Sequence, residues 1–146
     1  MDCVEVLPEK NTNFTLDHRN ESLEIVLGKD LTEKLQHLNL FMVGVGALGC
    51  ELIKNFAMLS IGCGEENLDK KQVKGKVTMT DPDMIELSNL TRQFLFREKH
   101  IGMPKSLTAA SAVVQMNPYM KNHIVALQEK VFDGTSHIFN DNFFES

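Results

Sequence analysis

The stretch "FMVGVGALGCELIKNF", from Phe41 to Phe56, places three glycines between an apolar run and a helix-like pattern. Apolar residues predominate from Leu40 to Val45, a length typical of a buried strand. Leu48, Leu52 and Phe56 then recur at intervals of four, which puts them on one face of a helix. The segment therefore predicts a strand, a glycine turn and a helix in succession.

The glycines of this turn, Gly44, Gly46 and Gly49, match the pattern G-x-G-x-x-G. In nucleotide-binding proteins the first glycine permits a tight turn, the second lets the backbone approach phosphate oxygens, and the third lets the helix pack on its strand. The N-terminus of the helix adds free N–H groups and partial positive charge. Glycine turns also occur in α/β proteins that bind no nucleotide, so the pattern favours a phosphate-bearing ligand without identifying it.

Composition and charge exclude several classes of function. The 146 residues suffice for one domain, and a net charge of −5 with no basic stripe argues against nucleic-acid binding. The N-terminal segment has no continuous apolar run, so we expect neither a signal peptide nor a membrane anchor. Cys3, Cys50 and Cys63 lack the spacing of a disulfide framework or a zinc site and are interpreted as structural thiols. We therefore expect a protein of the cytoplasm and nucleus that contacts neither nucleic acid nor membrane.

Two regions are expected along the chain. Residues 1–29 are polar and weakly patterned, and they predict an extended or loosely ordered arm. Residues 30–146 predict a partial Rossmann-like domain, in which the glycine- and charge-rich connection 60–76 is a surface insertion. A second strand over residues 77–80 completes a β-α-β unit, whose crossover makes its two strands parallel. Further predicted elements are a short helix capped by Asp30, a helix that begins at Pro104 and ends at Asn117, a third strand over 123–127, and a short amphipathic helix within 133–146. The predicted fold class is α/β, with a doubly wound and mostly parallel sheet that stops after about three strands.

The polar residues after the second strand form the one cluster that suggests chemistry. Asp81 ends this strand, where nucleotide-binding sheets hold a ribose hydroxyl, although an aspartate before Pro82 is also typical of a simple turn. An amide, a guanidinium, a second amide and an ammonium follow it, a set that suits an anionic triphosphate. Taken singly, each of these side chains would fit a solvated polar loop: Asn89, Arg92, Gln93 and Lys105.

Several motifs together resemble the active adenylation domain of ubiquitin-activating enzymes, from about Arg19 to the C-terminus. They are "VGVGALGCELIKNFAM", "TDPDMIELSNLTRQFLFR", "KS" at Lys105, and "QMNP" at Gln115 to Pro118. The resemblance implies a Rossmann-like adenylation fold of the ThiF type. It also implies that Arg92 and Lys105 are catalytic and that the ATP-binding residues are Gly44, Gly46, Gly49, Asp81, Asn89, Arg92, Gln93 and Lys105.

The resemblance further implies a reaction and its partners. In this family the C-terminal carboxylate of ubiquitin or a ubiquitin-like protein attacks the α-phosphate of Mg-ATP, giving an acyl adenylate and pyrophosphate. An inactive adenylation half lends an arginine, and this need fits the present chain because the segment from Arg19 to Leu23 contains no second arginine. A cysteine domain and a domain that docks a ubiquitin-conjugating enzyme complete the family's enzymes. Neither domain is present here, and the Mg²⁺-binding aspartate is expected beyond Ser146, so we expect a fragment that is inactive alone.

Two alternatives to a fragment of an activating enzyme remain. One is a short non-catalytic module that binds a ubiquitin-like protein or an adenylation-half partner. The other is an NAD-dependent oxidoreductase, which the glycine pattern alone would permit. The second alternative gives no function to the polar side chains after the second strand, because hydride transfer needs no cations that bind a triphosphate. These side chains are Asn89, Arg92, Gln93 and Lys105.

Overall fold

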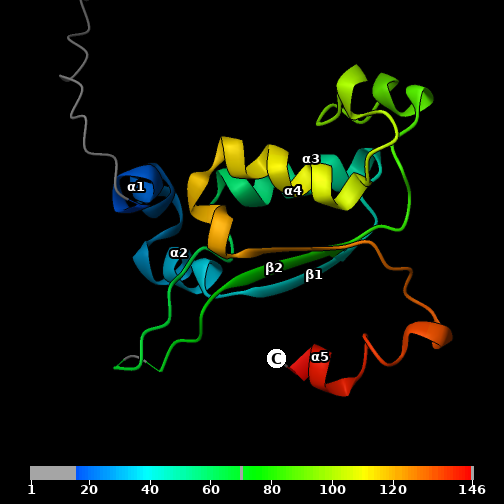
Figure 1. Ribbon diagram of the computed structural model, residues 1–146. Helices are drawn as coiled ribbons and strands as arrows, with labels where there is room; N and C mark the ends of the chain where they lie inside the picture. The colour runs from blue at the N-terminus through cyan, green and yellow to red at the C-terminus, as the bar shows by residue number, and fades with distance from the viewer. Residues whose placement is uncertain (1–15, 70, 146) are drawn as a thin grey trace, which may run out of the picture.

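The computed structural model describes residues 16–69 and 71–145. Within these residues the regular elements follow one another in the order α1 (Leu16–Leu27), α2 (Lys29–Gln36), β1 (Asn39–Val43), α3 (Ala47–Met58), β2 (Lys76–Thr80), α4 (Lys105–Met116), β3 (Ile124–Leu127) and α5 (Asp141–Glu145). Short 3₁₀ helices cover Leu87–Thr91, Glu98–His100, Pro118–Asn122 and Asp133–Thr135. Figure 1 shows the strands side by side beneath α3 and α4.

The three described strands form one parallel sheet in the order β1-β2-β3. Phe41 of β1 lies opposite Thr78 of the central strand, and Thr78 lies opposite Val125 of β3. Residues 77–80 of β2 are buried whichever face they point to, as expected for the middle of a parallel sheet. The predicted α/β class with a parallel sheet is therefore confirmed.

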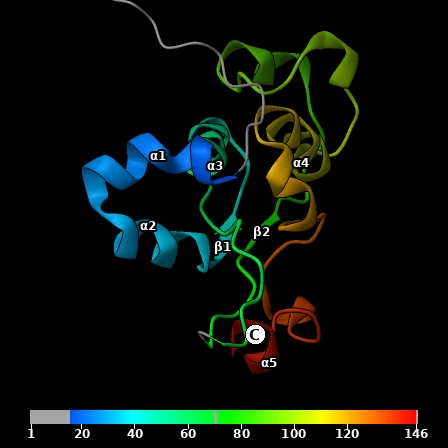
Figure 2. The ribbon, with the colours of Figure 1, turned by 90° about the vertical axis from the view of Figure 1, so that its left-hand side faces the viewer.

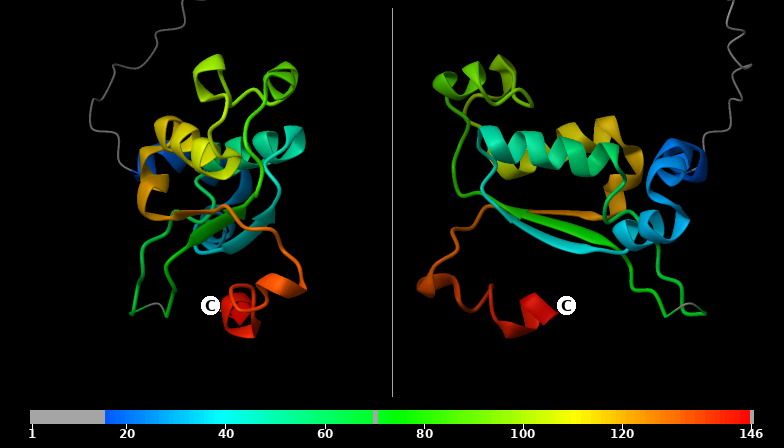
Figure 3. Two further views of the ribbon diagram at one scale, coloured as in Figure 1. Left: turned by 45° about the vertical axis from the view of Figure 1, so that its right-hand side comes forward. Right: turned by 180° about the vertical axis from the view of Figure 1, so that it is seen from behind.

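Helices α3 and α4 cover one face of the sheet, as Figures 1 and 3 show. Side chains that alternate along β2, Val77 and Met79, point into this layer and are fully buried. They belong to one apolar cluster with Ile53 of α3 and Val113 of α4, each with no exposed surface. This cluster is the core of the domain, and it holds the ends of α3, α4 and β2 that carry the candidate site.

The other face of the sheet is partly covered by the C-terminal segment, which packs on β1 and leaves Val125 of β3 39 % exposed. Phe41 contacts three phenylalanines of this segment, with ring centroids 4.9 to 5.9 Å apart. They are Phe139, Phe143 and Phe144, the last two within α5. The short helix predicted within residues 133–146 is thus found at Asp141–Glu145, and tilted and edge-on ring contacts hold it under β1 (Figure 3).

The N-terminal region differs from its prediction. The described part of residues 1–29 contains the helix α1, so the expectation of an extended arm is wrong there; residues 1–15 lie outside the described residues. The polar residues of α1 partly face the protein: Asn20 is 1 % exposed, and the Arg19 guanidinium donates to the carbonyl of Met116 at 3.2 Å. Gly28, at φ +83°, ends the helix in a conformation that favours glycine, and its N–H donates to Glu24. Figure 2 shows α1 and α2 together beside the sheet.

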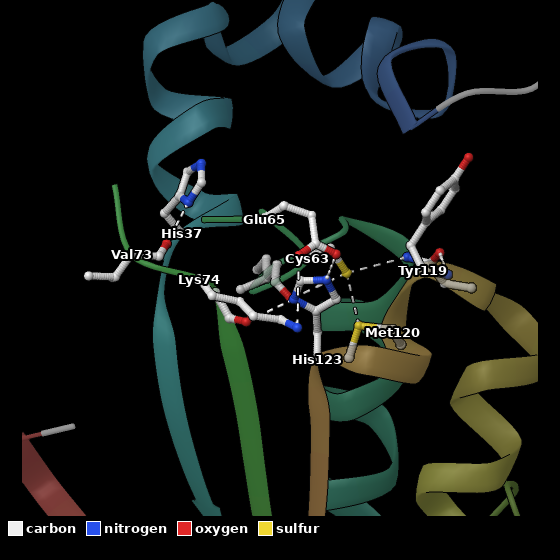
Figure 4. Close-up of polar contacts among 11 residues, drawn as sticks. His37, Cys63, Glu65, Val73, Lys74, Tyr119, Met120 and His123 are labelled. Atoms are coloured by element: carbon white, nitrogen blue, oxygen red, sulfur yellow. Dashed lines mark hydrogen bonds and ion pairs between the residues drawn. The ribbon is translucent and has the colours of Figure 1, made fainter. Parts of the chain in front are cut away.

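The connection between α3 and β2 is only partly the surface insertion that was predicted over residues 60–76, because residues 60–64 and Gly75 are buried and the exposed residues lie between them. His123 is 3 % exposed, and its two ring nitrogens lie 2.8 Å from the carbonyl oxygen of Gly75 and 3.0 Å from the Glu65 carboxylate (Figure 4). His37 Nδ1 lies 2.8 Å from the carbonyl oxygen of Val73. These contacts fix the backbone of Val73 and Gly75, immediately before β2 begins.

Candidate functional site

The glycine turn joins the end of β1 to the start of α3, as predicted. Gly44 has φ +93°, a conformation that favours glycine. A Cβ on Gly49 would lie 3.2 Å from the carbonyl carbon of Gly44 and closer still to its oxygen, so α3 can pack on the turn only with glycine there. A Cβ on Gly44 or Gly46 would meet nothing within 4 Å. The backbone of the turn is therefore tight on its inner side and open on its outer side, where a ligand could approach it.

Asp81 joins the end of β2 to this turn. Its side chain is buried, with the residue 5 % exposed, and Oδ2 accepts from the N–H of Val45 at 2.6 Å. Its Oδ1 accepts from the N–H of Asp83 at 2.9 Å. Carboxylate oxygens each have two lone pairs, so Asp81 can still accept from a further donor. The carboxylate fixes the backbone around the predicted ribose position, and a ribose contact stays a prediction.

Lys105 is brought to the same place by the N-terminus of α4. The residue is 7 % exposed, its Nζ lies 2.8 Å from Asp83 Oδ2, and its N–H donates to the Asp83 carbonyl at 3.0 Å. A continuous series of hydrogen bonds thus runs from Val45 through Asp81 and Asp83 to Lys105. Asp83 was not among the residues singled out from the sequence, although the spacing D-x-D after the strand could have indicated it.

The remaining predicted residues lie on the 3₁₀ helix of residues 87–91 or immediately after it. Asn89 is 6 % exposed, and its side-chain oxygen accepts from the N–H of Glu86 at 2.9 Å. Arg92 is exposed and donates to the carbonyl of Ser88 at 2.9 Å. Gln93 is 3 % exposed, and its Oε1 is buried without a hydrogen-bond partner. Within the described residues, no hydrogen bond joins these side chains to Asp81, Asp83 or Lys105.

Cys50 lies between the glycine turn and the segment that follows Gln93. This thiol of α3 accepts a backbone hydrogen bond from Leu95, lies 3.8 Å from the carbonyl oxygen of Val45, and is close enough to Asp81 and Lys105 to sense their charges. Burial raises the pKa of the Cys50 thiol to about 11, so the group is neutral at pH 7 and poorly nucleophilic. The residues that follow Gln93 are therefore packed against α3 behind the glycine turn.

The other cysteine in the described residues is also buried. Burial raises the pKa of Cys63 to about 11, and its sulfur lies 3.1 Å from that of Met120 (Figure 4). Cys50 and Cys63 thus fit the predicted role of structural thiols, whereas Cys3 lies outside the described residues. Across residues 16–69 and 71–145, no group of three histidine, cysteine or acidic side chains could hold a metal ion. In the same ranges no helix is long and apolar enough to cross a membrane.

Comparison with known proteins agrees with this geometry. The sequence model of the ThiF family matches residues 18–146. The chain belongs to the ThiF family. This ThiF-family chain is 50 % identical over 126 residues to ubiquitin-like modifier-activating enzyme 6 of Mus musculus. The alignment covers 86 % of the chain and 11 % of that enzyme. It is 46 % identical over 143 residues to the Homo sapiens enzyme of the same name, covering 98 % of the chain and 12 % of the enzyme.

Another relative is ubiquitin-like modifier-activating enzyme 1 of Oryctolagus cuniculus, 44 % identical over 151 residues and 99 % of the chain. The ThiF-family chain spans only 11 to 13 % of the length of these relatives. Among solved structures, E. coli tRNA N6-threonylcarbamoyladenosine dehydratase TcdA, in complex with ATP, matches with a TM-score of 0.69. At 18 % identity, this match covers 84 % of the chain and 44 % of TcdA. E. coli MccB matches with a TM-score of 0.66 at 21 % identity, over 86 % of the chain and 34 % of MccB. The two structures support the ThiF-type, Rossmann-like fold.

Proposed function

We propose that this ThiF-family chain forms the nucleotide-binding part of an adenylation site, and that the parent protein activates the C-terminus of ubiquitin or a ubiquitin-like protein with ATP. The hydrogen-bonded series from Val45 through Asp81 and Asp83 to Lys105 carries the proposal. It joins a glycine turn, a buried carboxylate and a buried ammonium, which are the parts that a nucleotide with its phosphates requires. The names of the relatives support the choice of substrate.

Three features of the site fit ATP. The outer side of Gly46 is open, so a phosphate or ribose can lie against the backbone there. A hollow of about 310 Å³ beside the turn, lined mainly by apolar atoms of Met42, Val43 and Leu52 with the glycines, suits the flat face of a base. The buried Oε1 of Gln93 has no partner, and leaving such an oxygen unsatisfied costs about 1–3 kcal/mol, so a ligand or water donor is expected there.

Different residues of the site have different proposed roles in adenylation. Asp81 accepts from a ribose hydroxyl while it holds the turn, and Lys105 and Arg92 contact the phosphates. In the reaction, a carboxylate oxygen of the substrate protein forms a bond to the α-phosphorus, and the bond from that phosphorus to the bridging oxygen of pyrophosphate breaks. Negative charge that grows on the transferred phosphorus and the leaving group is stabilised by the ammonium and the guanidinium.

Magnesium is not assigned to any residue of this chain. The described residues contain no group of three candidate ligands, and Asp83, the exposed carboxylate of the site, is paired with Lys105. We therefore derive no step through a metal ion, and a Mg²⁺ ion bound with ATP remains a proposal for the parent protein.

The partners and the compartment are proposed on the same basis. The parent protein would contact ubiquitin or a ubiquitin-like protein, an inactive adenylation half, and a ubiquitin-conjugating enzyme through other domains. It would act in the cytoplasm and nucleus. The net charge of −5 supports the expectation that nucleic acid is not a partner.

ATP binding by this chain is the first test. Isothermal titration of residues 1–146 should give weak binding of ATP and no tighter binding of NAD⁺. Lys105→Ala should weaken ATP binding by about tenfold, the scale of losing one charge-assisted contact. Lys121→Ala, an exposed lysine in the 3₁₀ helix of residues 118–122, is the matched control and should leave the affinity unchanged. Tighter binding of NAD⁺ than of ATP, or equal effects of the two lysine variants, would exclude the proposal.

A further inference from the structure

A groove of about 490 Å³ lies between α4 and the preceding segment of residues 94–104. None of the residues predicted to bind ATP lines it, so the proposed nucleotide site does not account for it. Its size is that of a binding pocket rather than of a packing defect. The groove is therefore a second candidate binding feature of the chain.

The floor of the groove is one exposed stripe of α4. Leu107, Ser111 and Gln115 recur at intervals of four, so they lie on one face of the helix, and all three are exposed. Leu107 is 50 % exposed and gives this stripe its apolar surface. Ser111 and its neighbour Ala112 are small, so the middle of the stripe would let a second helix approach to the usual interaxial distance of about 8–10 Å.

Two methionines add apolar surface to the groove. Met103, just before α4, is 45 % exposed, and Met116, the last residue of α4, is 37 % exposed. Methionine side chains are flexible and adapt to the shape of a partner. With Leu107 they give the groove apolar contacts near both ends of the helix.

All of the charged residues that line the groove are basic or can become cationic: Arg97, Lys99 and His100. The charged lining of the groove is thus basic, although the chain as a whole has a net charge of −5. The Arg97 guanidinium donates to the carbonyls of Phe94 and Phe96, which fixes the wall of the groove. No carboxylate of the described residues forms an ion pair with Arg97 or Lys99, although Glu98 stands between them in the sequence and does not line the groove.

We propose that this groove binds an acidic amphipathic helix of a partner protein. The apolar side of that helix packs on Leu107, Met103 and Met116, and its carboxylates face Arg97 and Lys99. The stripe of α4 has the length and the small central residues that helix-on-helix packing requires. The basic residues of the groove lining favour acidic over basic partners and increase the rate of encounter.

The proposal is tested with the whole chain and a synthetic probe. The probe is an amphipathic helical peptide of about four turns, with leucines at i, i+4 and i+7 and glutamates on the flanks, and its partner peptide has lysines in place of the glutamates. Binding is followed by fluorescence anisotropy. We expect the acidic peptide to bind, with an affinity that falls as salt is added, and the basic peptide to bind at least about tenfold more weakly.

Variants locate the binding site. Ser111→Arg, which fills the middle of the groove, should reduce the affinity for the acidic peptide by about tenfold or more, whereas Ser136→Arg should not change it. Ser136 is exposed and belongs to the C-terminal segment. Figure 1 shows this segment on the other side of the sheet from α4. Lys99→Glu, at an exposed position, should weaken binding by about threefold to fivefold and serves if Ser111→Arg fails to fold.

Three results would overturn the proposal. The first is equal binding of the acidic and basic peptides. The second is equal affinity of Ser111→Arg, Ser136→Arg and the unchanged chain for the acidic peptide. The third is concentration-dependent dimerisation in sedimentation that Ser111→Arg abolishes, because the groove would then be occupied by a second copy of the chain.

Discussion

Replacing Gly49 by alanine separates the packing role of the glycine turn from its role in binding. A Cβ there would lie 3.2 Å from the carbonyl carbon of Gly44 and closer to the oxygen, whereas ordinary contacts begin at 3.4 Å. The obstacle is backbone, so α3 or the turn must move, and we take the cost at about 3 kcal/mol, the upper part of the range for overpacked cores. Alanine recovers about 1 kcal/mol through its better helix propensity. A net loss of about 2 kcal/mol in the free energy of unfolding is expected.

Gly46→Ala is the matched control. Its Cβ would meet nothing within 4 Å, and its φ of −77° suits any residue. We therefore expect stability to change by less than about 0.5 kcal/mol, while ATP binding weakens because the methyl group occupies the space proposed for the ligand. Thermal unfolding checks both variants: Gly49→Ala should lower the Tm by about 4–8 °C and Gly46→Ala by about 2 °C or less. A Gly49→Ala protein as stable as the unchanged chain, or a larger Tm loss in Gly46→Ala, would refute this account of the turn.

Three further predictions concern charge. In the parent protein, Arg92→Ala and Lys105→Ala should each slow ATP–pyrophosphate exchange by more than about tenfold, and exchange at the unchanged rate in either variant would contradict the assigned roles. Asp83→Asn should reduce stability in urea unfolding by about 1–2 kcal/mol, because the Lys105 side chain is only 9 % exposed and loses its ion-pair partner, while the 64 % exposure of the carboxylate limits the loss. The loss should shrink in high salt, and a salt-independent loss would point to another cause. Burial raises the pKa values of the Cys50 and Cys63 thiols from 9.0 to about 11, so the native state holds these protons more tightly than the unfolded state. The stability from these thiols is full below pH 9 and is lost as the pH rises towards 11, which unfolding at stepped pH would detect; replacement of both cysteines by alanine should flatten that loss.

The parts of the fold that were predicted from sequence depend on local pattern. The run from Leu40 to Val45 and the glycines after it identify a strand, a turn and a helix because each needs only nearby residues. The second strand follows from the right-handed crossover rule, and the parallel pairing of β1 with β2 confirms it. Local pattern and the crossover rule were therefore enough for the presence of these elements but not for every detail: Leu48 and Leu52 of the apolar stripe are exposed, and α2 is capped by Gly28 rather than by Asp30.

Helix α1 was missed because the contacts that hold it are remote in sequence. Its residues are mostly polar, and its apolar residues show little preference for one face, so the segment lacks the usual signal of a buried helix. What stabilises it is tertiary: Arg19 reaches the C-terminal end of α4, and Asn20 is buried. A single sequence gives no sign that a polar side chain such as Asn20 faces inward.

The two cations proposed for catalysis are prepared to different degrees. Lys105 is buried at the start of α4 and already oriented by the carboxylate of Asp83, so little reorganisation is needed when a phosphate replaces that partner. Arg92 is exposed and donates only to the carbonyl of Ser88 on its own 3₁₀ helix, so a ligand or a partner must fix its position. Donors that are fixed in advance stabilise a transition state more effectively than donors that must be ordered during the reaction. A ligand or partner that fixes the guanidinium would therefore increase the contribution of Arg92 more than that of Lys105.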